Sequence, residues 1–253
     1  VNCFGGSDGE VTVAGADGTA PYEYSLDGGT YQLSGTFTGL TAGNHTVTIM
    51  DANGCTYDVN ITITQPTELK GNVDSQVDVL CFGESTGEVT VSGHDATPPY
   101  QYSLNGGSYQ ASGTFTGLAA GSHTVTIRDA NGCTTDVSVT ITQPATALSG
   151  VIANQINVDC YGSNTGEVTV AGVDGTAPYE YSLDGGAYQV SGTFTGLAAG
   201  NYVVTVMDDH GCTYDVSVTI TQPAAALTGA ITDQVNVNCF GGSDGEVTVA
   251  GAD

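Results

Sequence analysis

Residues 45–64 read HTVTIMDANGCTYDVNITIT, and the alternation of apolar and polar side chains in this stretch decides the fold class. A period of two is typical of a strand that buries one face. The apolar side chains expected to point inward are Val47, Ile49, Tyr57, Val59, Ile61 and Ile63. Between the two runs, Asp-Ala-Asn-Gly at 51–54 has the composition of a tight turn. The stretch therefore predicts two antiparallel strands joined by a turn.

The same pattern recurs along the chain as an internal repeat of about 79 residues. Each copy has a cysteine followed by an aromatic residue and glycine, and each of the first three has a second cysteine 52 residues later and closes on Thr-Gln-Pro. The opening cysteines are Cys3, Cys81, Cys160 and Cys239, and the second cysteines are Cys55, Cys133 and Cys212. The predicted domains are 1–66, a repeat that lacks its first strand, the complete repeats 67–144 and 145–223, and the start of a further repeat at 224–253. Because 237–253 repeats 1–17 letter for letter, we expect the chain to be a piece of a longer array.

Within a complete repeat the alternating runs predict seven short strands and nothing of helical period. One polar and one apolar face per strand is typical of two small sheets packed face to face. The predicted fold is all-β, a tandem array of immunoglobulin-like antiparallel β-sandwiches of about 79 residues each.

The charge balance excludes several classes of partner. Two basic residues stand against 27 acidic ones, for a net charge of −25. Nucleic acids and anionic membrane surfaces are bound through Lys and Arg, so neither is an expected partner. No apolar run approaches the ~20 residues of a membrane span, so no membrane insertion is expected in this region. Evenly placed cysteines favour an oxidising compartment, and we expect an extracellular, cell-surface location.

Whether an odd or an even number of strands separates two cysteines indicates if they lie at the same end of a repeat and can pair. Counting five strands between the turns of Cys81 and Cys133 places the two turns at opposite ends of one repeat, too far apart for a disulfide. The count favours bonds between neighbouring repeats, Cys3–Cys133 and Cys81–Cys212. One further short strand would reverse the parity and favour bonds within repeats. That alternative is Cys3–Cys55, Cys81–Cys133 and Cys160–Cys212.

Three acidic positions recur in the repeats and are candidates for a calcium site. They are Glu10, Glu88 and Glu167; Asp17, Asp95 and Asp174; and Asp51, Asp129 and Asp208. The alternative is that they are turn residues and solvated surface carboxylates. Calcium is the only cofactor that the sequence suggests.

Residues 194–206 have the pattern of a tyrosine corner, with Tyr202 two residues before the inward Val204. His45 and His123 occupy the same position in the other repeats. Each histidine is either a ring that stands in for the corner tyrosine or a metal ligand or pH switch.

Nothing in the sequence points to catalysis. No repeat contains a Ser-His-Asp set, a phosphate-binding loop or a Cys-x-x-Cys pair. We expect no enzymatic activity and assign no catalytic residues.

Five motifs follow one another along the repeat: the Cys-aromatic-Gly opening, Pro-Tyr-x-Tyr-Ser, Gly-Leu-x-Ala-Gly, Asp-Ala-Asn-Gly-Cys and Thr-Gln-Pro. In these motifs the repeat resembles the SprB-type repeat of surface adhesins used in gliding motility by Bacteroidetes-type bacteria. One departure is that Leu26, Leu104 and Leu183 stand where many such repeats carry Trp. The resemblance implies type IX secretion and display as an extracellular filament. It also implies adhesion to a surface and a cell-envelope motility machinery as the partner that moves the adhesin.

Two functions are compatible with these expectations. In the first, adjacent repeats contact one another and form the shaft of an adhesin that holds a tip away from the cell. In the second, the repeats themselves bind a glycan, polysaccharide or other extracellular surface multivalently, with calcium as a possible requirement. Outward threonines such as Thr46 and Thr48 and an exposed Tyr31 would serve the second function.

Overall fold

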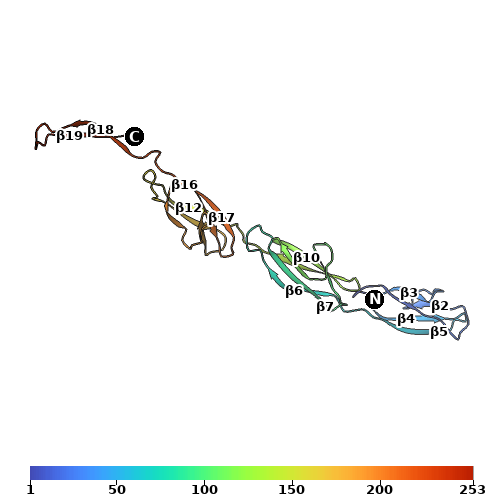
Figure 1. Cartoon of the computed structure of the whole chain (residues 1–253). Helices are drawn as coiled ribbons and strands as arrows, with labels where there is room; N and C mark the ends of the chain where they lie inside the picture. The colour runs from blue at the N-terminus through green and yellow to red at the C-terminus, as the bar shows by residue number, and fades with distance from the viewer. Residues whose placement is uncertain (253) are drawn as a thin grey trace. The chain divides into compact units, whose positions relative to one another are not determined.

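The computed structural model describes residues 1–252 as strands and connecting turns (Figure 1). Asp253, which continues the acidic position of Asp17, lies outside the described residues. Residues 1–252 include no helix long and apolar enough to cross a membrane. The fold is all-β, as predicted from the period-two pattern.

The second repeat shows the complete sandwich. Its strands are β6 (Lys70–Val77), β7 (Gly87–His94), β8 (Gln101–Leu104), β9 (Thr114–Leu118), β10 (Gly121–Arg128) and β11 (Thr134–Ile141). They form two antiparallel sheets, ordered β6-β7-β9 and β8-β10-β11. Alternate side chains of both sheets meet in a core that includes Val89, Val91, Val125 and Ile127.

The third repeat has the same plan. Its strands are β12 (Ser149–Ile156), β13 (Gly166–Val173), β14 (Glu180–Leu183), β15 (Thr193–Leu197), β16 (Gly200–Met207) and β17 (Thr213–Ile220). Its sheets are β12-β13-β15 and β14-β16-β17. The core again joins both sheets, with Val168, Val170, Val204 and Val206 at its centre.

The two ends of the chain carry partial copies of this plan. The first repeat has β1 (Gly9–Thr12), β2 (Glu23–Leu26), β3 (Thr36–Leu40), β4 (Gly43–Met50) and β5 (Thr56–Ile63). Its sheets are β1-β3 and β2-β4-β5. Residues 224–252 contain the hairpin of β18 (Thr228–Val235) and β19 (Glu246–Ala252).

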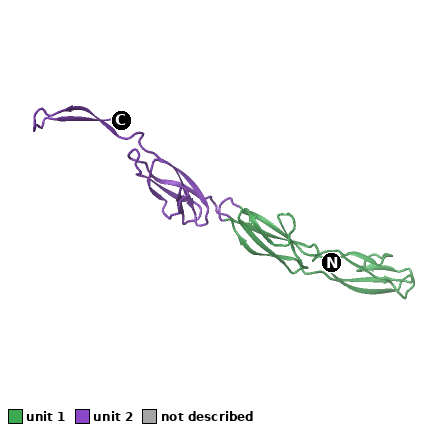
Figure 2. Cartoon of the chain, viewed as in Figure 1, with its two compact units in different colours: residues 1–79, 85–142 green, residues 80–84, 143–253 purple. Residues whose placement is uncertain are grey.

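The chain divides into two compact units (Figure 2). The first comprises residues 1–79 and 85–142, and the second comprises residues 80–84 and 143–253. The short loop 80–84 follows β6 in sequence but packs with the second unit. This loop carries Cys81.

The strand count of the prediction was wrong, although its conclusion about the two ends of a repeat holds. A repeat has six strands instead of seven, and only β7, β8, β9 and β10 lie between Cys81 and Cys133. β8 and β9 are four and five residues long, and the segment between them turns back to bridge Gln110 to Tyr102. Because these two short strands together make a single crossing of the repeat, the number of crossings stays odd.

One hydrogen bond shows directly that the two cysteines of a repeat lie at opposite ends. The amide of Val79, two residues before Cys81, donates to the carbonyl of Thr142 at 2.9 Å. Thr142 follows the last residue of β11, whereas Cys133 precedes its first residue. An eight-residue strand separates these points by roughly 25 Å.

Candidate functional site

Two disulfides are the most distinctive covalent feature of the structure. Cys3 is bonded to Cys133 and Cys81 to Cys212, each with a Cα–Cα distance of 5.6 Å. Each bond joins the opening cysteine of one repeat to the second cysteine of the next. The structure does not contain the alternative bonds within repeats (Cys3–Cys55, Cys81–Cys133 and Cys160–Cys212), because the two cysteines of a repeat lie at opposite ends. Cys55, Cys160 and Cys239 are exposed free thiols.

The opening cysteine is presented by a tight turn. Gly5 and Gly83, two residues after the cysteine, have φ of 72° and 80°, which favour glycine. The amide of Gly5 donates to the side-chain oxygen of Gln65 at 2.7 Å, and that of Gly83 donates to Gln143 at 2.8 Å. The sequence analysis missed this role of the glutamine. The closing Thr-Gln-Pro of every repeat was the available signal.

The second cysteine is presented by the Asp-Ala-Asn-Gly turn. One carboxylate oxygen of Asp129 accepts hydrogen bonds from the amides of Asn131 at 3.0 Å and Cys133 at 2.8 Å. The other oxygen accepts from the amide of Thr97 at 3.3 Å. In the first repeat Asp51 accepts the corresponding bonds, led by the bond from the Thr19 amide, and these hold the pKa of Asp51 below its ordinary value. The aspartate therefore fixes the turn from which the cysteine projects.

The structure places the three acidic positions in turns and strands. Asp17, Asp95 and Asp174 occupy turns with positive φ, and Glu10, Glu88 and Glu167 lie within strands. Asp51, Asp129 and Asp208 direct their carboxylates at backbone amides. Among residues 1–252, no three His, Cys, Asp or Glu side chains gather closely enough to hold an ion.

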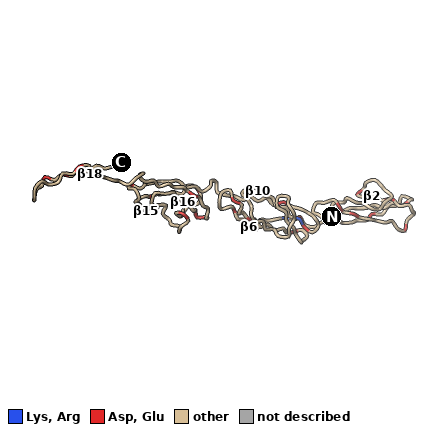
Figure 3. Tube along the Cα trace, turned by 45° about the horizontal axis from the view of Figure 1, so that its top comes forward, with Lys and Arg blue, Asp and Glu red and all other residues tan. Residues whose placement is uncertain are grey.

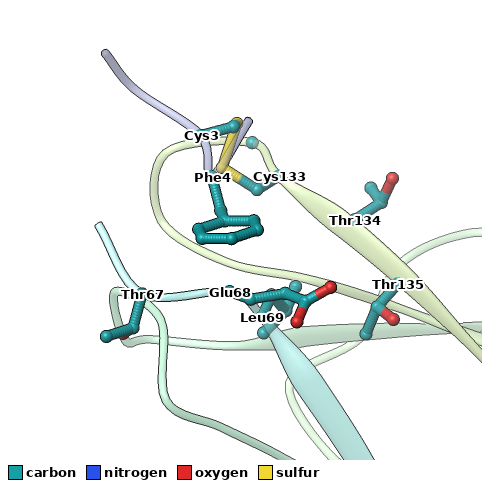
Figure 4. A pocket seen from close by; sticks show the side chains of 9 residues that line it. Cys3, Phe4, Thr67, Glu68, Leu69, Cys133, Thr134 and Thr135 are labelled. Atoms are coloured by element: carbon teal, nitrogen blue, oxygen red, sulfur yellow. A yellow bond between two sulfur atoms is a disulfide. The ribbon is translucent and has the colours of Figure 1, made fainter. Parts of the chain in front are cut away.

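A hollow of about 370 Å³ opens beside the Cys3–Cys133 bond. The ring of Phe4 lies between the disulfide and the segment 67–69, and 53% of Phe4 remains exposed (Figure 4). The corresponding hollow beside Cys81–Cys212, of about 200 Å³, is lined in part by Phe82. An exposed aromatic ring therefore accompanies each disulfide.

The corner residues adopt one geometry in all three repeats. The Tyr202 hydroxyl donates to the Ala198 carbonyl at 3.1 Å. His45 places Nε2 3.0 Å from the Thr41 carbonyl, and His123 places Nε2 2.9 Å from the Ala119 carbonyl. The histidine rings therefore occupy the place and make the bond of the corner tyrosine. His45 Nδ1 additionally lies 2.8 Å from Asp27 Oδ2.

Part of each of the first three repeats is similar to a known family model. A family model described as the SprB repeat matches residues 1–35, 73–108 and 152–188. Each matched segment contains the opening cysteine, its turn and the next two strands. No curated protein sequence matches the chain.

Several solved structures are distantly similar to the chain. The N-terminal eight Ig domains of Down syndrome cell adhesion molecule match with 13% identity and a TM-score of 0.35, over 86% of this chain and 34% of that one. Insect hemolin matches with 12% identity and a TM-score of 0.29, over 87% and 72%. The human desmocollin-1 ectodomain matches with 12% identity and a TM-score of 0.27, over 79% and 51%. Such low TM-scores carry no argument about function.

Proposed function

Because the chain carries three SprB-type repeats, we propose that it is a shaft region of a bacterial cell-surface adhesin, extracellular and engaged in gliding motility. In this proposal the repeats transmit tension between a motility machinery in the cell envelope and an adhesive part elsewhere in the protein. Type IX secretion and a filamentous form belong to the same proposal. They rest on the family and not on a feature of the fold.

The interleaving of the disulfides is the observation that supports a role under tension. The loops closed by Cys3–Cys133 and Cys81–Cys212 both include residues 81–133. The second repeat is thereby tied covalently to the repeat before it and to the repeat after it. If a sandwich opens under tension, these bonds limit how far the chain can lengthen.

The charge distribution supports a role in which the chain is exposed to solvent and neighbouring chains repel one another. Acidic side chains occur in every repeat, whereas both basic residues, Lys70 and Arg128, lie in the second (Figure 3). A net charge of −25 opposes lateral aggregation of such chains at low salt.

Single-molecule stretching of the chain by its two ends tests the proposal. With both disulfides intact, the shortest covalent route from end to end contains about 100 residues, or roughly 350 Å when extended. After reduction the whole chain extends to roughly 900 Å. A Cys3→Ser, Cys81→Ser double variant is the matched control and should behave like the reduced protein without reductant. Equal lengths for the oxidised and reduced wild type would exclude the proposed restraint.

A further inference from the structure

The dipeptide Asn-Gly occurs three times in the chain, at 53–54, 105–106 and 131–132. In this dipeptide a side-chain amide is readily lost, because glycine carries no side chain that would hinder attack of its backbone nitrogen on the preceding asparagine. All three asparagines are exposed. The sequence therefore gives the three sites equal standing, and the differences between them come from the fold.

The backbone nitrogen that would attack is free at one of the three sites. At 53–54 and 131–132 the glycine N–H donates to the carbonyl of the aspartate that opens the turn, at 2.9 Å and 3.1 Å. Within residues 1–252 the N–H of Gly106 has no hydrogen-bond partner, because its turn is closed by the bond from Gly107 N–H to the Leu104 carbonyl at 2.9 Å. Attack by the Gly106 nitrogen therefore breaks no hydrogen bond.

The side-chain amide of Asn105 is held at both of its polar atoms. Its oxygen accepts a hydrogen bond from the Thr124 N–H at 2.9 Å, and its nitrogen Nδ2 lies 3.1 Å from His123 Nδ1. His123 Nε2 faces the Ala119 carbonyl, which can only accept, so in the neutral ring Nε2 carries the hydrogen and Nδ1 accepts from the Asn105 amide. The Thr124 N–H is thereby placed to stabilise the negative charge that develops on the amide oxygen during attack.

His123 lies beside the nitrogen that has to leave. Attack converts Asn105 Nδ2 from an amide nitrogen to an amine, to which a ring protonated at Nδ1 can donate a proton. At the other two sites this nitrogen donates to a threonine hydroxyl, at 2.9 Å from Asn53 and at 3.0 Å from Asn131. Because a hydroxyl is a far weaker acid than an imidazolium ring, only Asn105 has an effective proton donor at its leaving nitrogen.

We propose that Asn105 is a site of spontaneous modification, at which the side-chain amide becomes a carboxylate. The Gly106 nitrogen loses its proton to water and bonds to Asn105 Cγ, the bond from Cγ to Nδ2 breaks, and ammonia leaves with a proton from His123. One water molecule then opens the resulting cyclic imide, adding its hydroxyl to a carbonyl carbon and its hydrogen to the nitrogen. His123 regains its proton from solvent. The net reaction consumes one water and releases one ammonia, without oxidation or reduction.

The other repeats show that an aspartate fits this position. Asp27 and Asp184 occupy it in the first and third repeats, and each accepts a hydrogen bond from a strand amide at 2.8 Å, as Asn105 does in the second. In the first repeat the carboxylate also lies 2.8 Å from the ring of His45. Opening of the imide at Cγ therefore gives the second repeat the same ion pair, with His123 in the place of His45.

Trypsin makes the test direct, because each of the peptides 1–70, 71–128 and 129–253 contains one Asn-Gly site. The purified folded chain is stored at neutral pH, sampled over time, reduced and digested, and the mass of each peptide is measured. We expect 71–128 to gain one mass unit at least about fivefold faster than the other two, the factor expected for one backbone hydrogen bond. In urea with the disulfides reduced, where only the local sequence matters, the three rates should become similar.

Three variants test the site itself. Asn105→Gln should abolish the mass gain of 71–128, whereas Asn72→Gln, the matched control at an exposed position of the same peptide, should retain it. His123→Tyr installs the corner residue that the third repeat has in Tyr202, so it keeps the corner hydrogen bond while it removes the imidazole. It should slow the mass gain at least about tenfold.

A fourth variant, Asn105→Asp, is the reference for the product. Part of the 71–128 peptide from stored wild type should co-elute with the same peptide of this variant, and the rest should elute as the isoaspartate form. In Asn105→Asp the ring protons of His123, followed by NMR, should titrate at a higher pH than in fresh wild type, because a carboxylate beside the ring favours its protonated form.

Equal rates for the three peptides of the folded chain would overturn the proposal, and so would an unchanged rate in His123→Tyr. A His123 titration that does not move in Asn105→Asp would exclude the ion pair. None of these results affects the stretching experiment, which depends on Cys3–Cys133 and Cys81–Cys212. The modification of Asn105 and the proposed function therefore fail separately.

Discussion

At the scale of the residue, the corner of the first repeat differs from the others by one ion pair. Both ring nitrogens of His45 face acceptor oxygens, so the protonated ring donates from Nδ1 to the Asp27 carboxylate and from Nε2 to the Thr41 carbonyl. The hydrogen bond with Asp27 raises the pKa of His45 above its ordinary value of 6.5, and the same bond lowers the pKa of Asp27 below 3.8. In the second repeat Asn105 takes the place of Asp27 beside His123.

The pair of His45 and Asp27 makes the stability of the first repeat depend on pH. Because the pKa of His45 is raised, its contribution to stability is complete below pH 6.5 and is lost as the pH rises through the folded-state pKa. Because the pKa of Asp27 is lowered, its contribution is present above pH 3.8 and is lost as the pH falls through the folded-state pKa. Both contributions are present between these limits.

Asp27→Asn removes the carboxylate while copying the neighbour that His123 has in the second repeat. We expect the pKa of His45 to fall toward 6.5, measured by NMR titration of its ring protons. Asp58→Asn, which alters a carboxylate bonded to Thr48 on a neighbouring strand, is the control and should leave that pKa unchanged. A pKa of His45 that does not move in Asp27→Asn would contradict the assignment.

Gly113 is the second residue whose replacement has a defined cost. Its carbonyl accepts a hydrogen bond from the Val91 amide at 2.9 Å, and an added Cβ would overlap the carbonyl oxygen of Val91. Because both groups are backbone, neither can move aside cheaply. We expect Gly113→Ala to lower the free energy of unfolding by about 1–3 kcal/mol. Ala111→Ser, at an exposed neighbour, should change it by less than about 0.5 kcal/mol in a denaturant titration.

At the scale of the element, the direction in which β11 runs decides which cysteines can meet. Trypsin has only Lys70 and Arg128 as sites, so it divides the chain into 1–70, 71–128 and 129–253. After digestion in urea without reductant and with free thiols blocked, we expect all three peptides to remain in one covalent species. Mass spectrometry before and after reduction measures this.

The controls for this digestion are single cysteine variants. Cys3→Ser should release 1–70 alone, and Cys81→Ser should release 71–128 alone. Release of 1–70 from the wild type would instead indicate a Cys3–Cys55 bond, the alternative within the repeat.

The sequence was informative wherever a feature depends on local alternation. The runs ending at Ile49 and Ile63 predict β4 and β5 because the period of two is a property of each strand alone. Tyr57 shows the limit of this reasoning, since it is 72% exposed although the alternation places it inward, and Tyr214 at the same position of the third repeat is 43% exposed. The count of seven strands was too high, because alternation alone does not show whether a short extended run pairs in a sheet, and a complete repeat has six strands.

The candidate site was predictable in part for a similar reason. The cysteine pairing follows from the number of chain crossings, which survived the wrong strand count. The calcium hypothesis named Asp51, Asp129 and Asp208 among its candidate ligands, with turn residues as the alternative. Their carboxylates accept hydrogen bonds from amides two and four residues further on, and this contact depends on the three-dimensional shape of the turn.

At the scale of the whole molecule, a shaft and a multivalent adhesive differ in whether an extracellular surface retains the purified chain. The purified chain, passed over glass, polysaccharide and cell-wall material, should show no saturable retention. Calcium and a chelator should give the same result, because the carboxylates of Asp51, Asp129 and Asp208 already accept hydrogen bonds from backbone amides. Saturable retention would make the repeats the adhesive, with Phe4 and Phe82 as the first aromatic side chains to replace.

The spacing of the bonded cysteines also imposes an order in time. A chain made from its N-terminus presents Cys55 to Cys3 long before Cys133, which is 130 residues away from Cys3. Oxidation of an unfolded chain therefore favours the wrong, nearer partner. A folded repeat holds its two cysteines at opposite ends, so folding before oxidation selects the distant partner. Folding before oxidation therefore prevents the wrong disulfide. The opening cysteine of each repeat remains a thiol until the next repeat has folded.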